Sequence, residues 1–209
     1  MVTIYFIRHG ESVGNKENRF RGRFDFELNE NGIRQAEALR NELSDVKFSA
    51  IYSSPLSRAE KTARIIARDQ VGISCCEELT NIHLGSWENQ PKALIREQYP
   101  QLWQTWLTSP EDLAFEGMES FAEVQKRAYG FILQLLPQHS GQIIGVVSHR
   151  AVLKPLFAAI LELPGRYFWK FDIDTAAYSI VEYRTERGFT FTNLNQNKHL
   201  VNFIREDLG

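Results

Sequence analysis

The chain opens with a run of β-branched and aromatic residues over positions 2–7, which ends abruptly at Arg8-His9-Gly10. A run with so few polar residues predicts a strand buried on both faces, as in the parallel sheets of α/β proteins. The carboxyl ends of such strands open into ligand crevices. We therefore expect an α/β fold in which the imidazole of His9 lies on the floor of a site.

Strand-like and helix-like segments alternate along the rest of the chain, with no Gly/Ser-rich linker and no internal repeat. This alternation predicts one domain over residues 1–209, with a mixed sheet covered by helices. The later strands are predicted at 48–52, 73–76 and 142–147, followed by an antiparallel pair at 177–183 and 189–194. Helices are predicted at 30–43, with Asn29 as the N-cap, at 119–136 and at 151–161. A further helix is predicted after the second strand, with Arg58 in its first turn.

Composition narrows the classes of function. A formal net charge of −2 and an apolar content of 43% argue against a disordered chain and against a generally basic nucleic-acid binder. Cys75 and Cys76 are adjacent in a predicted strand and would point to opposite faces, so we expect neither a disulfide nor a metal pair. The apolar start is too short for a leader and no stretch is long enough to span a bilayer. These features predict a soluble, cytoplasmic protein with no membrane or nucleic-acid partner.

Charged side chains recur where predicted strands end. Arg8 and His9 follow the first strand, Arg58 lies just after the second, and His149 follows a later apolar strand. Because the carboxyl ends of parallel strands meet at one edge, these four side chains would form a cationic pocket suited to a phosphoryl group. Asn15 would add a neutral donor.

A histidine in such a pocket has a chemical role open to it. An imidazole nitrogen can attack phosphorus when the other ring nitrogen is held by a backbone carbonyl, and water then resolves the phosphohistidine. Arginines and a second histidine would stabilise the charge on the phosphoryl oxygens. This scheme needs no metal and no other cofactor.

Four groups of motifs, spread over most of the chain, carry a resemblance to a known family. They are Arg8-His9-Gly10-Glu11-Ser12 with Asn15; Gly22-Arg23-Phe24-Asp25 with Leu28, Gly32 and Gln35-Ala36; Tyr52 to Ala59 with Thr62-Ala63; and Ile82 to Glu88 together with Val146 to His149. Through them the chain resembles the histidine phosphatase superfamily, in its phosphoglycerate-mutase-like branch of cofactor-independent phosphatases. Residues 172–179 are weakly similar to members that hydrolyse phosphoserine.

The resemblance implies a three-layer α/β fold, with a mostly parallel mixed sheet between helices on both faces. It implies His9 as the phosphorylated nucleophile, with Arg8, Arg58 and His149 around the phosphoryl group and Asn15 nearby. The expected activity is metal-independent hydrolysis of a phosphomonoester in a small phosphorylated metabolite. The family likeness also allows a homodimer.

The first departure from the family lies at Asn81, where a glutamate usually acts as general acid. An alkoxide is too basic to leave unprotonated at neutral pH, so loss of the acid is expected to cost on the order of 10²–10⁴ in rate. One explanation is that Glu78, His83 or Glu88 replaces the acid. The others are a substrate with a good leaving group, such as an acyl phosphate, a phosphoanhydride or an aryl phosphate, or a noncatalytic phosphate-binding role.

Two further departures add positive charge. Arg150 stands where the family commonly has glycine after the second histidine, and Arg21 stands where a glutamine often precedes Gly22. If both face the pocket, along with Arg23, the ligand would carry more negative charge than a simple monoester. The alternative is that the loop arginines are solvated and Arg150 brackets a helix start. The candidate substrate-binding residues are Asn15, Arg21, Gly22, Asn81 and Arg150.

Residues 88–118 are expected to form a lid or side wall over the site, with substrate choice in the aromatic-rich part at 97–115. Trp103, Trp106 and Phe115 in this part hint at an organic leaving group. The four tryptophans are interpreted as core or pocket wall and not as a stacking platform; they are Trp87, Trp103, Trp106 and Trp169.

The sequence leaves three functions open. The leading one is hydrolysis of a small phosphorylated metabolite through phospho-His9. The alternative is a poorly active phosphate-binding or regulatory relative, which would explain Asn81 but not the intact set of arginines and histidines. A phosphoglycerate mutase is the third, although mutases of this family commonly run longer than 209 residues.

Overall fold

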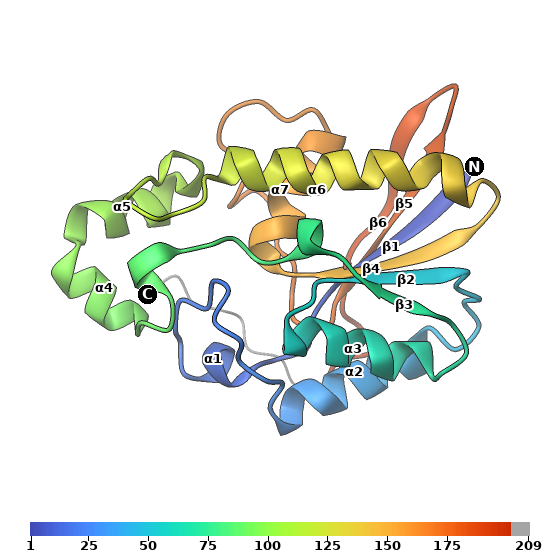
Figure 1. Cartoon of the computed structure of the whole chain (residues 1–209), viewed down its shortest axis with the longest axis horizontal. Coiled ribbons are helices and arrows are strands. Elements are labelled where there is room, and N and C mark those ends of the chain that lie inside the picture. The colour runs from blue at the N-terminus through green and yellow to red at the C-terminus, as the bar shows by residue number, and fades with distance from the viewer. Residues whose placement is uncertain (202–209) are drawn as a thin grey trace.

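The computed structural model describes residues 1–201 and shows a six-stranded mixed sheet between helices (Figure 1). The strands are β1 (Val2–Arg8), β2 (Ala50–Ser53), β3 (Ile73–Cys75), β4 (Ile143–Ser148), β5 (Tyr178–Arg184) and β6 (Gly188–Gln196). Their order in the sheet is β3-β2-β4-β1-β5-β6. The first four in this order are parallel, and β5 and β6 add antiparallel strands beside β1.

Helices cover both faces of the sheet. The α-helices are α1 (Val13–Lys16), α2 (Glu30–Glu42), α3 (Ser57–Ala67), α4 (Lys92–Gln98), α5 (Pro100–Thr108), α6 (Phe121–Leu135) and α7 (Arg150–Ile160). Short 3₁₀ turns lie at Glu77–Leu79, Gly85–Trp87, Pro110–Asp112 and Leu136–His139. In Figure 1, α2 and α3 lie below the sheet and α6 and α7 above it, while α4 and α5 extend beyond its end on the left. The predicted single α/β domain with a mostly parallel sheet is confirmed.

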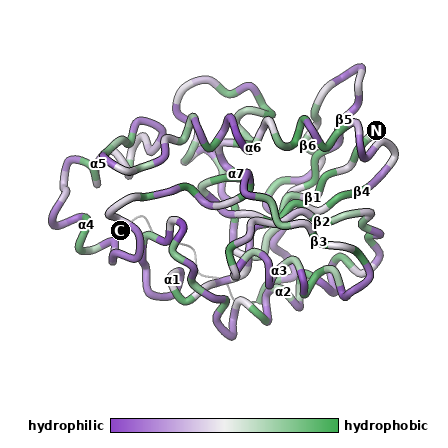
Figure 2. Tube along the Cα trace, in the orientation of Figure 1, coloured by the Kyte–Doolittle hydropathy of each residue, from purple (hydrophilic) through white to green (hydrophobic). Residues whose placement is uncertain are grey.

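The apolar run in β1 is buried on both faces, as its composition predicts. Ile4 and Phe6 belong to the core that α6 and α7 cover, whereas Ile7 belongs to the core under α2 and α3. Figure 2 shows the same concentration of apolar residues along the central strands, with hydrophilic stretches on the outer helices. Burial of both faces holds the carboxyl end of β1 in a fixed place.

The predicted elements are all present, with small shifts at their ends. The second strand starts at Ala50 and not at Phe48, and the long helix starts at Phe121 because Ser120 forms a capping box with Glu123. Asn29 caps α2 as expected, since its side chain accepts a hydrogen bond from the amide of Gly32.

Both cysteines lie within the described residues 1–201. Cys75 is exposed and Cys76 half-buried, and both are free thiols. Within these residues, no helix is both long enough and apolar enough to cross a lipid bilayer.

Candidate active site

The site lies where β1, β4 and β2 end side by side. Arg8 pairs with Ser148 in the parallel ladder, and the amide of His9 donates to the carbonyl of Ser148 at 3.0 Å. The amide of Ser54 donates to the carbonyl of Val147 at the same edge, also at 3.0 Å. The structure therefore brings His9 and His149 together, with ring centroids 4.9 Å apart.

His9 is buried and held by its own backbone neighbour. Its Nδ1 lies 2.6 Å from the carbonyl oxygen of Gly10, which can only accept, so we assign the ring proton to Nδ1. Nε2 then carries the lone pair. Burial and the charges of Arg58 and Arg8 hold the pKa of His9 well below its usual range, so the ring is neutral at neutral pH.

His149 is oriented by Ser54. Its Nε2 lies 2.8 Å from the Ser54 hydroxyl oxygen, which also accepts from the amide of Leu56 at 3.3 Å. The hydroxyl is best satisfied if it donates to Nε2, which places the proton of His149 on Nδ1, a buried atom with no partner among residues 1–201. Burial and the charge of Arg58 lower the pKa of His149 well below its usual range. Ser54 is a site residue that sequence reasoning missed.

Two arginines lie against the histidine pair. Arg8 donates from Nη1 to the carbonyl of Ile173 at 2.7 Å. Arg58 is fully buried and donates to the carbonyls of Phe24 and Gly22 at 3.0 and 2.9 Å. Burial lowers the pKa of Arg58 to about 9, which still leaves it charged at neutral pH. Its Nε is a buried donor without a partner in the described chain, which suits an oxyanion.

A pocket of about 500 Å³, including the part open to solvent, lies in front of these residues. Arg8, His9 and His149 line it directly, while Arg58 lies behind its wall. Most of the further lining residues are basic or aromatic: Arg19, Arg21, Lys92, Arg150, Phe20, Trp106 and Phe168. The others are small, apolar or neutral: Gly22, Asn81, Ile82, Leu84 and Ala151. Arg19 and Lys92 were not singled out from the sequence, since no motif distinguishes them from other surface cations.

Arg21 and Arg150, whose orientation the sequence left open, both line the pocket. Arg21 donates from Nη1 to the carbonyl of Arg19 at 3.1 Å. Arg150 places its guanidinium 5.5 Å from the ring centroid of Trp169 and 5.9 Å from that of Phe168. Their charges therefore add to those of the histidine and arginine set.

Asn81 and Gly22 lie together at the pocket wall. Gly22 has a φ of +49°, and its carbonyl accepts from Asn81 Nδ2 at 2.9 Å as well as from Arg58. The Oδ1 of Asn81 is a buried acceptor with no partner in residues 1–201. Arg23 points elsewhere, because it is exposed and donates to the carbonyl of Asn81 and to Glu119. Asn15 caps α1 through Ser12 and does not line the pocket.

The three candidate acids lie outside the pocket lining. Glu78 is exposed, and its carbonyl accepts from Arg127. The Nδ1 of His83 lies 2.7 Å from the carbonyl of Gly117. The carboxylate of Glu88 accepts from the amides of Arg23 and Leu84, at 2.9 and 3.0 Å.

The protein matches known proteins along almost its full length. The model of the histidine phosphatase superfamily (branch 1) matches residues 4–197. Phosphoserine phosphatase 1 of Hydrogenobacter thermophilus is 34% identical over 207 residues, which cover 99% of this chain and 98% of that protein. The adenosylcobalamin/alpha-ribazole phosphatase of Escherichia coli is 29% identical over 182 residues, covering 87% of this chain and 90% of that protein.

A solved structure agrees with these sequence matches. Bacillus stearothermophilus YhfR superposes with a TM-score of 0.92 at 31% identity, covering 96% of this chain and 100% of that one. The fold and the matches over almost the full chain indicate the same family as the motifs around His9, Arg58 and His149. The chain belongs to the histidine phosphatase superfamily.

Proposed function

We propose that the protein is a phosphomonoester hydrolase that acts on a small phosphorylated metabolite through a phosphohistidine on His9. The observation that carries this proposal is the state of His9. Its ring is neutral, its Nδ1 is held by the Gly10 carbonyl, and the ring lies beside that of His149. A lone pair held in a cationic pocket is the arrangement that attack on a phosphoryl group requires.

The neighbouring groups have defined roles in this proposal. Arg8 and Arg58 neutralise the phosphoryl oxygens, and the Nδ1–H of His149 donates to one of them in the transition state. Loss of one such donor typically costs about 3 kcal/mol of barrier. The scheme uses no metal, because protein cations supply the charge that a metal ion would otherwise supply.

The relatives support hydrolysis of small phosphorylated substrates, since they are named as phosphatases of phosphoserine and of alpha-ribazole compounds. We also propose that residues 88–118 form the side wall that selects the substrate. Trp106 of α5 lines the pocket, and Phe115 stacks on the buried ring of Trp87, with ring centroids 4.6 Å apart.

One observation favours a second candidate, a poorly active phosphate-binding relative. Asn81 occupies the wall position where the family usually has a carboxyl, and an amide cannot donate a proton to a leaving group and recover it. A noncatalytic protein would bind phosphate and form no phosphoenzyme.

The test measures phosphate release and acid-labile phosphoenzyme with an aryl phosphate, in the presence of a metal chelator. We expect turnover by the wild type, loss of at least about 10³-fold in His9→Ala, and no effect of the chelator. His199→Ala is the control, because His199 bonds to the carbonyl of Ala176 outside the pocket. Wild-type protein that binds phosphate but forms no phosphoenzyme would establish the binding role instead.

A further inference from the structure

The part of the pocket beyond the histidine pair is strongly basic. Arg19, Arg21, Lys92 and Arg150 line it, and no residue of the lining, as far as the described chain goes, carries a carboxylate. Because in the proposed function the phosphoryl group lies at His9 between Arg8 and His149, with Arg58 behind the wall, the rest of a substrate must occupy this basic part. The described lining suits an anion and includes no carboxyl group that could donate a proton.

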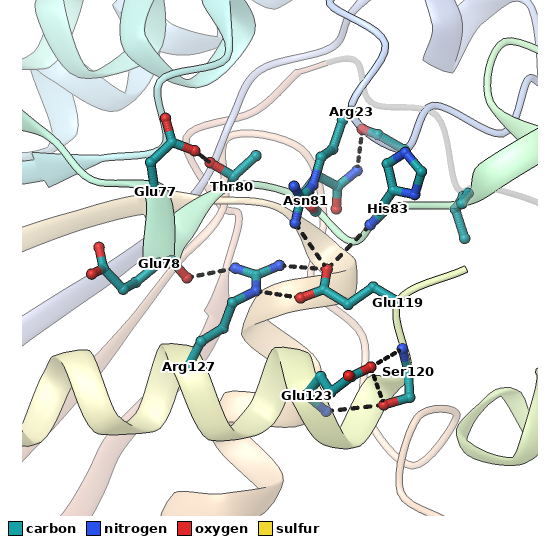
Figure 3. A network of polar contacts seen from close by, with 12 residues as sticks. Arg23, Glu77, Glu78, Thr80, Asn81, His83, Glu119, Ser120, Glu123 and Arg127 are labelled. Atoms are coloured by element: carbon teal, nitrogen blue, oxygen red, sulfur yellow. Dashed lines mark hydrogen bonds and ion pairs between the residues drawn. The ribbon is translucent and has the colours of Figure 1, made fainter. Parts of the chain in front are cut away.

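Two carboxylates accept hydrogen bonds from backbone amides just after Asn81, Glu119 from His83 and Glu88 from Leu84. Glu119 accepts from Arg127 at 2.7 and 3.0 Å and from Arg23 at 3.2 Å (Figure 3). Burial raises the pKa of Glu119, but the bonds and charges of Arg127 and Arg23 outweigh it, so the pKa is lowered and the group is ionised. Glu88 is tied to two backbone amides. Neither is a proton donor held against the pocket.

The residue at the family's acid position is itself fixed. Asn81 is 7% exposed, and its Nδ2 is committed to the carbonyl of Gly22 at 2.9 Å. Arg21, the residue before Gly22, brings a guanidinium whose charge lowers the pKa of both His9 and His149. A positive charge thus lies near the reacting groups at the wall where an acid would otherwise stand.

We propose, resting on hydrolysis through phospho-His9 as above, that the preferred substrate is an anhydride of phosphate and not an alkyl monoester. Its leaving group is a weakly basic oxyanion, either a carboxylate from an acyl phosphate or a phosphate from a phosphoanhydride. Arg21 and Arg150 bind this anion as it departs. Loss of the acid and gain of two cations are then two parts of one adaptation, because an anion that needs no proton is stabilised by positive charge.

The basicity of leaving groups explains why this works. The conjugate acid of a carboxylate has a pKa of about 4 and that of a phosphate about 6, whereas an alkoxide is about as basic as hydroxide, so the pKa of its conjugate acid lies far above both. General acid catalysis is therefore worth much to an alkyl phosphate and little to an acyl phosphate.

Both steps balance without an external acid. In the first, a bond forms between Nε2 of His9 and phosphorus, the bond from phosphorus to the leaving oxygen breaks, and the electron pair departs on the carboxylate or phosphate. In the second, water oxygen bonds to phosphorus, the N–P bond breaks, and the pair returns to Nε2. Both protons of the water remain on the released phosphate, as dihydrogen phosphate.

The experiment compares kcat/KM for five compounds: acetyl phosphate, pyrophosphate, para-nitrophenyl phosphate, phosphoserine and glycerol 1-phosphate. Phosphoserine is the informative comparison, since it offers a carboxylate to the basic pocket but must leave as an alkoxide. We expect wild-type kcat/KM for acetyl phosphate or pyrophosphate to exceed that for phosphoserine by at least about 10²-fold. Whichever of the first two is preferred distinguishes the carboxylate from the phosphate source.

Three variants separate the parts of the proposal. Asn81→Glu should raise turnover of phosphoserine and glycerol 1-phosphate by about 10²-fold or more, while Asn81→Gln, which adds length without an acid, should not. Arg150→Gly should lower kcat/KM for acetyl phosphate or pyrophosphate by about tenfold more than for para-nitrophenyl phosphate, whose leaving group spreads its charge over a ring.

The outcomes distinguish this proposal from the phosphatase function on which it rests. If wild type hydrolyses phosphoserine within tenfold of acetyl phosphate in a His9-dependent way, a working acid exists and only this proposal fails. If wild type is inactive and Asn81→Glu alone is active, the proposal also fails, because no anionic leaving group suffices. If neither forms a phosphoenzyme, the phosphatase function itself is wrong.

Discussion

Two neutral histidines in a buried cationic pocket make the stability of the folded protein depend on pH. The pKa values of His9 and His149 are lowered well below 6.5, mainly by burial, so the folded state takes up no proton there when the unfolded chain does. Below the unfolded pKa, unfolding is therefore coupled to proton uptake, and stability falls with falling pH until the folded pKa is reached. Above pH 6.5 this contribution is fully present.

The expected loss can be measured by thermal or urea unfolding at a series of pH values. Lowering the pH to one unit below 6.5 should reduce the free energy of unfolding by about 1.4 kcal/mol for each of the two histidines. His9→Gln and His149→Gln should each remove about half of that dependence. His83→Gln should leave it in place, because that side chain is 45% exposed. An unchanged pH dependence in both site variants would contradict neutral burial.

At the scale of single residues, the sequence predicts which side chains meet only where the order of the strands in the sheet decides where those side chains lie. His9 and His149 follow strands that are neighbours in the sheet, so their meeting follows from the strand ends. The orientation of Arg21 depends instead on the loop at Gly22, which has a positive φ. The orientation of Arg150 depends on the rings of Phe168 and Trp169, which come after its helix in the chain. No local pattern reports such contacts.

At the scale of elements, the loop after β1 is locked onto the start of α2. A Cβ at Gly32 would overlap the backbone carbonyl of Glu11, and the amide of Gly32 also makes the cap bond to Asn29 at 2.8 Å. The atoms that this Cβ would overlap are all backbone atoms of Glu11, so the backbone must shift to admit a methyl group. Since His9 and Gly10 lie in the same loop, this contact holds His9 in position.

Gly32→Ala should therefore destabilise the protein by about 3 kcal/mol, which is typical of an overpacked site that cannot relax. The matched control is Gly130→Ala within α6, where a Cβ meets no atom within 4 Å. This change should stabilise by about 0.5–1 kcal/mol, because alanine loses less backbone entropy in a helix. Urea unfolding of both variants is the measurement, and similar effects of the two substitutions would refute the contact.

Element types were predictable because burial sets the pattern, whereas element ends were not. The runs in β1 and β4 are apolar on both faces, and α2 alternates buried and exposed residues at helical spacing. The start of α6 depends on reciprocal bonds between Ser120 and Glu123, and β2 starts only where Ala50 pairs with Ile144. The end of a strand is thus set by where its partner strand pairs with it, and the hydrophobic periodicity of one segment carries no information about that partner.

At the scale of the whole molecule, positive charge is concentrated at one end of the sheet although acidic residues outnumber basic ones, 26 to 24. The basic side chains at or behind the pocket are Arg8, Arg19, Arg21, Arg58, Lys92 and Arg150. Two cores, one on each face of the sheet, hold the strand ends that bring them together. Folding therefore brings these positive charges close together, where they repel one another, and a bound anion reduces that repulsion.

Inorganic phosphate should consequently stabilise the fold as a ligand of the native state. Binding adds RT ln(1 + [L]/Kd), about 1.4 kcal/mol at tenfold excess over Kd, which for a chain of 209 residues raises Tm by about 3–6 °C. Thermal unfolding in phosphate and in sodium chloride of equal ionic strength measures this. Screening alone would give the same shift in both salts, whereas a built site gives it in phosphate only. Arg58→Met should weaken the phosphate-specific part, because it removes a buried positive charge directly behind the pocket wall.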